Sequence, residues 1–125
     1  MMISNNGNVN MPKISSVNKA GNIGTSLMGY ITISYSVLVE KLGEPNVGSY
    51  KTDAEWVVEF DNGDIATVYN YKDGKNYNGA GGLETIDITE WHIGGSNQNV
   101  RRWLTDHLLS NWPPAFEAIR QEAEY

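Results

Sequence analysis

Alternating apolar and polar positions in the middle of the chain predict an antiparallel hairpin. Residues 55–60 and 65–71 are rich in the aromatic and β-branched side chains that favour strands. Between them lies Asp61-Asn62-Gly63-Asp64, in which Asn-Gly favours a two-residue type I′ turn. Such a turn pairs Phe60 with Ile65. The expected core face of the hairpin then carries Trp56, Val58, Phe60, Ile65, Thr67 and Tyr69.

The opposite face of this hairpin is predicted to carry carboxylates around an apolar centre, in which Val57 lies opposite Val68. The residues placed there are Glu55, Val57, Glu59, Ala66, Val68 and Asn70. Asp61 and Asp64 extend the negative charge to the turn. These carboxylates predict a surface for a basic protein partner, with the two valines as its apolar centre. Alternatively, they keep the chain soluble and protect an edge strand.

Apolar residues at helical spacing predict two helices, one before and one after this hairpin in the sequence. The first covers residues 35–42, follows a capping Ser34 and is ended by Gly43 and Pro45. The second covers about residues 98–110, where the apolar stripe consists of Val100, Trp103, Leu104, His107 and Leu108. A third helix is expected from about residue 115 onward, after the two prolines.

The remaining segments complete a predicted α+β fold. Residues 27–33 and 86–93 read as strands, and residues 72–85 form a long glycine-rich loop. We therefore expect a small antiparallel sheet, the hairpin plus one or two further strands, with helices packed on one face. Residues 1–24 contain many asparagines but no aromatic or acidic residue, and predict a mobile arm before a single domain over residues 25–125. Alternatively, the arm orders on a partner or adds an edge strand.

Composition narrows the classes of function. The 125 residues are 40% hydrophobic and carry nine basic and fifteen acidic side chains, a net charge of −6 that disfavours direct nucleic-acid binding. The chain has no cysteine, which excludes disulfides, thiol nucleophiles and thiolate metal sites. We also see no apolar run of about 20 residues and no secretory leader, so no membrane contact is expected.

A second candidate site lies around the glycines that follow the last predicted strand. Trp91-His-Ile-Gly-Gly95 precedes the helix that carries Arg101 and Arg102. Together with His92 and with Tyr77 from the glycine-rich loop, these arginines could hold a nucleotide by phosphate contacts and stacking. Alternatively, the glycines only allow a tight turn. No nucleophile–base set is recognisable, so we expect no enzyme, no catalytic residue, no metal and no cofactor.

Four stretches within residues 29–95 resemble a group of small proteins found chiefly in bacteriophage genomes. They are Tyr35-Ser-Val-Leu-Val-Glu-Lys-Leu-Gly-Glu-Pro45, Glu55-Trp56, Asn70-Tyr-Lys-Asp-Gly-Lys75 and Trp91-His-Ile-Gly-Gly95. Small acidic phage accessory proteins are often inhibitors of host machinery, including anti-CRISPR proteins. The resemblance implies a phage-encoded inhibitor in the host cytoplasm that binds a host defence protein with a basic, nucleic-acid-binding face. The alternative is a sponge for a nucleotide immune signal. A homodimer is compatible with both.

Overall fold

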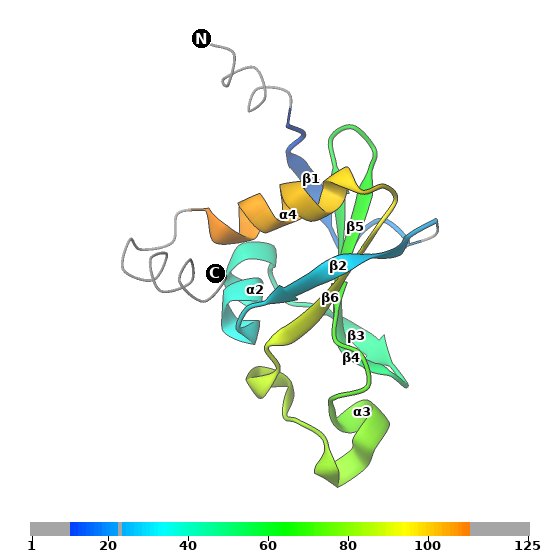
Figure 1. Ribbon diagram of the computed structural model, residues 1–125, viewed down its shortest axis with the longest axis vertical. Helices are drawn as coiled ribbons and strands as arrows, with labels where there is room; N and C mark the ends of the chain where they lie inside the picture. Colours follow the sequence, from blue (N-terminus) through cyan, green and yellow to red (C-terminus); the bar gives the residue numbers. More distant parts are fainter. Residues whose placement is uncertain (1–10, 23, 111–125) are drawn as a thin grey trace.

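The computed structural model describes residues 11–22 and 24–110, which form one antiparallel sheet with two longer helices on one side (Figure 1). The strands are β1 (Ile14–Val17), β2 (Ser26–Thr32), β3 (Asn46–Ser49), β4 (Thr52–Phe60), β5 (Ile65–Tyr69) and β6 (Glu90–Gly95). They run in the order β1-β4-β5-β6-β2, and β3 also pairs with β4. The predicted α+β class is confirmed, and the six-stranded sheet is larger than expected.

Helices α2 (Tyr35–Leu42) and α4 (Asn99–Leu109) lie where the periodicity predicts them. In α2 the Ser34 hydroxyl accepts a hydrogen bond from the first turn at 3.3 Å, and Gly43, with φ of 87°, ends the helix. The shorter segments are α3 (Lys75–Asn78) and the 3-10 turns η1 (Gly79–Gly81) and η2 (Thr85–Asp87). The helix expected from residue 115 lies outside the described residues.

The core lies between these two helices and the sheet and is centred on two tryptophans. Trp56 and Trp91 are fully buried, and their rings meet edge to face with centroids 5.6 Å apart. Each indole N–H donates to a backbone carbonyl, from Trp56 to Gly43 at 2.7 Å and from Trp91 to Ile33 at 2.9 Å. The fully or almost fully buried aliphatic side chains from the helices are Leu38, Leu42, Val100, Leu104 and Leu108.

The predicted register of the hairpin is wrong by one residue. Val58 lies opposite Ala66, and Trp56 lies opposite Val68. The loop has three residues, because the Phe60 N–H donates to the Asp64 carbonyl and the Gly63 N–H donates to the Phe60 carbonyl, both at 2.9 Å. With Gly63 at φ 93°, this is the common three-residue loop that ends in a left-handed glycine.

This shift exchanges the two faces of β5, because side chains alternate along a strand. Ala66 and Val68 enter the core, whereas Ile65, Thr67 and Tyr69 belong to the other face. The predicted core face of β4 is confirmed, because Trp56, Val58 and Phe60 are all buried in the core.

The N-terminal segment is part of the sheet, so the prediction of a mobile arm over residues 1–24 is wrong for the β1 residues. Strand β1 pairs with the end of β4, and Ile14 and Val17 pack against the core. Asn18 follows, and its N–H donates to the Val57 carbonyl at 2.7 Å. The alternative prediction, that this segment adds an edge strand, is correct for β1. Composition alone does not reveal it, because the stabilising contacts come from the edge of β4 and from the core.

Two other boundaries also differ from the sequence prediction. The last strand covers Glu90–Gly95 instead of residues 86–93, and η2 precedes it with a fully buried Ile88 after the turn. The glycine-rich segment 72–85 contains α3 and η1 instead of being an unstructured loop. Within the part of the chain described, no helix has the length and apolar character needed to cross a membrane.

Candidate functional site

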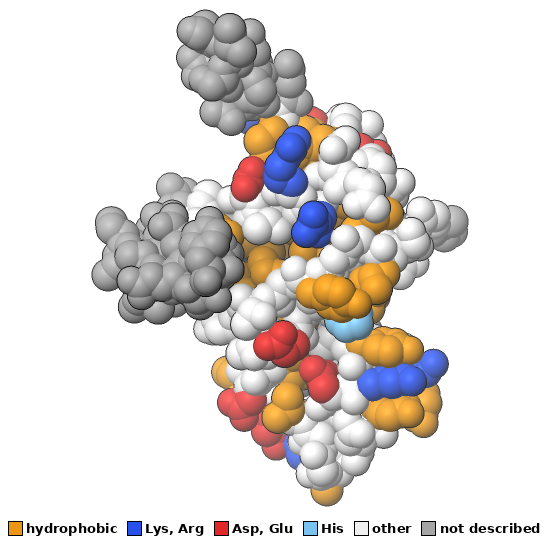
Figure 2. Space-filling view, in the orientation of Figure 1, with side chains coloured by type: hydrophobic (Ala, Val, Ile, Leu, Met, Phe, Trp, Pro, Cys, Tyr) orange, Lys and Arg blue, Asp and Glu red, His pale blue; other side chains and the backbone are white. Residues whose placement is uncertain are grey.

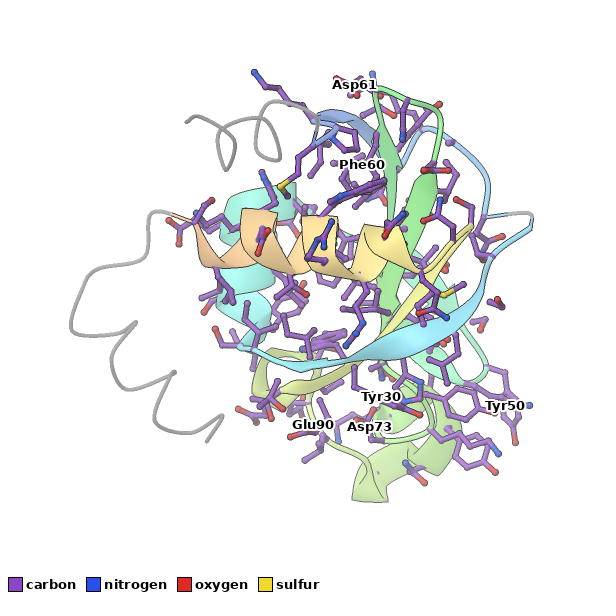
Figure 3. The ribbon with its side chains drawn as sticks, turned by 45° about the horizontal axis from the view of Figure 1, so that its top comes forward. Tyr30, Tyr50, Phe60, Asp61, Asp73 and Glu90 are labelled. Atoms are coloured by element: carbon purple, nitrogen blue, oxygen red, sulfur yellow. The ribbon has the colours of Figure 1, made fainter. Side chains whose placement is uncertain are left out.

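The second face of the sheet, which we call the open face, has neither α2 nor α4 packed on it (Figure 1). Strand register places four residues of this face side by side across β4, β5, β6 and β2. Glu55 lies opposite Tyr69, Tyr69 opposite His92, and His92 opposite Tyr30. Figure 3 shows Tyr30 on the side of β2 that faces away from α4, whereas Phe60 lies on the side of that helix.

Aromatic rings surround His92 on this face. Its ring centroid lies 4.9 Å from that of Tyr30 in an edge-on arrangement and 5.4 Å from those of Tyr69 and Tyr71. The side chains at the two ends of the group are open to solvent, Tyr30 with 64% and Tyr71 with 42% of its surface exposed. We call Tyr30, Tyr69, Tyr71 and His92 the aromatic row. Figure 2 shows a histidine between side chains of the hydrophobic class.

The surroundings favour an uncharged aromatic row at neutral pH. Partial burial lowers the pKa of the His92 imidazole, and the nearby Asp73 carboxylate opposes this shift only in part. Burial also raises the pKa of the Tyr69 hydroxyl, and the negative charge of Glu55 raises it further. The row therefore presents neutral amphipathic rings, the kind of surface enriched at protein interfaces.

A lysine joins the aromatic row to a second pair of tyrosines. The Lys72 ammonium lies 5.2 Å from the ring centroid of Tyr71 and 5.3 Å from that of Tyr77. Tyr77 also packs against Tyr50 at 5.2 Å between centroids. We call Tyr50, Lys72 and Tyr77 the tyrosine–lysine corner. Lys72 has a φ of 63°, which is uncommon for a residue other than glycine.

A buried asparagine fixes the segment that carries this corner. Asn70 is fully buried, and its Oδ1 accepts from the N–H groups of Asp53 at 2.8 Å and Ala54 at 3.1 Å. Its Nδ2 donates to carboxylate oxygens of Asp53 at 2.8 Å and Asp73 at 2.9 Å. The Asp53 carboxylate also accepts from the Asn76 N–H at 3.0 Å. Asn70, predicted on the outer face of the hairpin, is instead the centre of this network.

Between the aromatic row and the N-terminal segment the surface is hollowed. The hollow has a volume of about 420 Å³. Its lining includes Asn22, Thr25, Ser26, Leu27, Ser49, Lys51, Thr52, Glu55, Tyr69 and Tyr71. Thr67 and Gly94 form part of its floor. Its wall therefore combines aromatic rings, hydroxyl groups, a lysine and a carboxylate.

The acidic surface predicted from the hairpin does not form as expected. Val68 is fully buried in the core, and Val57 is 5% exposed and lies opposite Thr67, so the surface lacks the apolar centre. The register shift accounts for the burial of Val68, because it moves Val68 to the core face of β5. Asp61 remains exposed at the turn. The other carboxylates accept hydrogen bonds from neutral side chains, Glu55 from Asn22, Glu59 from Ser16, and Asp64 from Asn62 and Ser96.

The structure also divides the predicted nucleotide site. Tyr77 and His92 lie on the open side, connected through Lys72 and Tyr71. Arg101 and Arg102 belong to α4 on the covered side, because the buried side chains of that helix pack into the core. A Cβ at Gly29 would lie 2.3 Å from Cδ of Arg101, so this arginine crosses β2 on the core side.

The glycine pair at the end of β6 has a packing role. A Cβ at Gly95 would lie 2.1 Å from Cγ2 of Val100, and a Cβ at Gly94 would lie 2.5 Å from Oγ1 of Thr67. The glycines thus allow α4 and β5 to approach β6 closely, which is the simpler of the two readings of this motif. No group of three His, Asp or Glu side chains suited to a metal occurs among the described residues.

The sequence does not predict the tyrosine neighbours of His92. The two-residue turn places Tyr69 on the core face, and Tyr30 lies in a predicted strand whose neighbours the sequence does not give. The tyrosines at positions 30, 69 and 71 are visible in the sequence, but their gathering depends on which strands are neighbours. No protein-family model and no curated protein matches this sequence.

Proposed function

We propose that this chain is a binding protein that docks on a protein partner through the aromatic row. The observation that carries the proposal is the exposure of Tyr30 and Tyr71 beside His92, on a sheet face without a covering helix. Tyrosines that serve only the core are covered by other elements, whereas exposed clusters of this kind mark interaction surfaces. The biological setting we propose is a phage-encoded inhibitor of a host defence protein.

The overall charge of the chain supports a partner with a basic surface. Glu55 borders the row, as do Lys51 and Lys72, and Asp61 is exposed at the turn of the same hairpin. With a net charge of −6, the chain attracts a basic protein over a distance of about one Debye length, ~8–10 Å at physiological salt. In this proposal the acidic residues speed association, and the tyrosines supply most of the affinity.

The surroundings of His92 support binding over catalysis. Its neighbours are the rings of the aromatic row, and no hydrogen bond joins it to a hydroxyl or carboxylate within the described ranges. A general base needs an oriented proton path to a nucleophile or to a substrate atom. The ring instead fills the space between tyrosines, as a side chain in a contact surface does.

The test uses two variants of the tagged full chain in lysate from a host with a known defence system. Tyr30→Ala removes an exposed ring of the aromatic row, and Val47→Ala truncates a side chain that is 92% exposed on β3. A stoichiometric partner recovered with the wild type is purified and titrated calorimetrically against each variant. We expect Tyr30→Ala to weaken binding by about 30-fold, the effect of an interface hot spot, and Val47→Ala to bind like the wild type. Equal affinities for the two variants would contradict the proposal.

A further inference from the structure

A backbone hydrogen bond joins two lysines, one of which lines the hollow. The Lys72 N–H donates to the Lys51 carbonyl at 2.8 Å, and Lys51 lines the hollow. Neither ammonium lies within 4.0 Å of a carboxylate in the described part of the chain, where the ion pair present is Lys75–Glu84 at 3.4 Å. In a protein with a net charge of −6, both lysines of this backbone pair are therefore without an ion-pair partner in the described part of the chain.

Flat aromatic surfaces lie directly beside the Lys72 ammonium. Lys72 is between the rings of Tyr71 and Tyr77, and Tyr50 extends the group with 68% of its surface exposed. Figure 2 shows a basic side chain between two side chains of the hydrophobic class, next to the histidine. An exposed tyrosine ring can stack on the face of any nucleobase, and a neighbouring ammonium can bind its phosphate.

The arrangement is fixed before any ligand arrives. The Asn70 network holds the start of segment 72–85 to β4, and the Asn78 side chain donates to the Lys72 carbonyl at 2.9 Å. These contacts hold Lys72 at its φ of 63°. A lysine in this conformation is uncommon and strained, and the fold offsets the strain. A fixed site also loses less conformational entropy on binding.

The size and the polar groups of the hollow fit the remainder of a nucleotide. Its volume of about 420 Å³ lies within the range of small-molecule sites. Glu55 stands in its wall and can accept hydrogen bonds from sugar hydroxyls, while Thr67 offers a hydroxyl in the floor. Lys51, Glu55 and Tyr71 in the lining thus offer a matching group for phosphate, sugar and base, and Lys72 lies against Tyr71.

We propose that the hollow is a nucleotide site. Lys51 in the wall and Lys72, which lies against Tyr71 just outside the lining, bind the phosphate. The exposed ring of Tyr71 in the wall stacks the base, and Glu55 accepts from the sugar. This site replaces the arginine-based one expected from the sequence. The inference does not rest on the proposed function, because a free nucleotide needs no protein partner, although both sites use Tyr71 and Glu55.

The experiment is calorimetric titration of the purified full chain with AMP, with adenosine and with inorganic phosphate at 0.05 M and 0.2 M salt. We expect AMP to bind one-to-one, with an affinity at least 10-fold above that of adenosine or of phosphate, because each of these lacks half of the contacts. The affinity of AMP should fall as salt rises, because screening weakens the lysine contacts. An affinity of adenosine equal to that of AMP, or no binding of AMP, would overturn the proposal.

Variants locate the site within the chain. Lys51→Gln and Lys72→Gln should each weaken AMP binding at least 5-fold, whereas Lys13→Gln, an exposed lysine before β1 with the same change of charge, should leave it unaltered. Tyr71→Leu keeps apolar area but removes the stacking ring, and should weaken binding about 5-fold or more. Equal losses in the Lys13 and Lys72 variants would show a non-specific charge effect and overturn the assignment.

A final comparison distinguishes a free nucleotide from a nucleic-acid strand, because both carry the same phosphate, sugar and base. If a single-stranded octanucleotide binds more tightly than AMP, with the same loss in Lys72→Gln, the natural ligand is a nucleic-acid strand held at this site. If AMP binds at least as tightly, the ligand is a free nucleotide. Binding of the octanucleotide that does not respond to the Lys51 and Lys72 variants would contradict the site. All variants are first checked for the wild-type circular dichroism spectrum.

Discussion

Asn18 satisfies both backbone groups of Val57. Its N–H donates to the Val57 carbonyl at 2.7 Å, and its side-chain Oδ1 accepts from the Val57 N–H at 2.8 Å. Asn18 has a φ of 61° and lies where β1 ends, and the Asn46 side chain of β3 also donates to its Oδ1. A single residue therefore joins the two strands that share the outer edge of β4.

Replacing Asn18 tests this junction. Asn18→Ala should lower the free energy of unfolding by about 1–3 kcal/mol, because the N–H of the buried Val57 loses its acceptor. Asn18→Asp keeps the acceptor and should cost less, while Asn18→Gly keeps the left-handed backbone and should fall between the two. Urea denaturation measures all three. An alanine variant as stable as the aspartate variant would show that the side-chain contact contributes nothing.

The hairpin loop depends on the left-handed conformation of one glycine. Gly63→Val should destabilise the protein by about 1–3 kcal/mol, because a β-branched residue resists the φ of 93°. A Cβ at this position meets no atom within 4 Å, so the cost arises from the backbone and not from a clash. Gly63→Asn is the control, since asparagine tolerates this region, and thermal unfolding compares the two. Equal melting temperatures would refute this account of the loop.

Removing the side-chain network of Asn70 should destabilise the protein and loosen the tyrosine–lysine corner. Asn70→Ala leaves the buried N–H of Ala54 without its acceptor, and should lower the free energy of unfolding by at least about 2 kcal/mol. Hydrogen exchange of the amides in residues 73–78 should accelerate, whereas α4 amides should change only with global stability. Asn99→Ala, at an exposed asparagine, is the matched control. Unchanged exchange in 73–78 would mean that other contacts hold this segment.

The lowered pKa of His92 predicts a pH dependence of stability. The folded state binds a proton at His92 less readily than the unfolded chain, whose histidine titrates near 6.5. The contribution of the neutral His92 to the stability of the folded state is therefore fully present above about pH 6.5. It is lost as the pH falls below about 6.5, because protonation then favours the unfolded chain. His92→Phe should lose this part of the pH dependence between pH 7.5 and 5.5. A variant with the same pH profile as the wild type in denaturant titrations would contradict the assignment to His92.

Local sequence signals predicted the elements that depend on local contacts. Leu38 and Leu42 lie one helical turn apart and are followed by Gly43, so helix α2 follows from spacing and a stop signal. The apolar stripe of α4 is equally clear, and its buried members Val100, Leu104 and Leu108 are those predicted. In both helices the pattern and the tertiary contacts agree.

The features that the sequence did not predict depend on contacts between residues that are far apart in the sequence. The hairpin register follows from a three-residue loop instead of a two-residue one, and this single difference moves Val68 into the core and Tyr69 to the open face. Strand β1 is not predicted, because the segment around it is polar. It forms a strand because the edge of β4 supplies its hydrogen bonds. The aromatic row required the strand order, in which β2 lies beside β6 although far from it in sequence.

The most direct measurement of the central claim is the solvent exposure of tyrosine rings before and after the protein partner binds. A soluble paramagnetic agent broadens the ring signals of exposed tyrosines in NMR spectra of the selectively labelled chain. We predict that Tyr30 and Tyr71, exposed in the free protein, become protected in the complex, whereas the methyl groups of Val47 remain accessible. A complex in which Tyr30 and Tyr71 stay as exposed as in the free chain would contradict docking through the aromatic row.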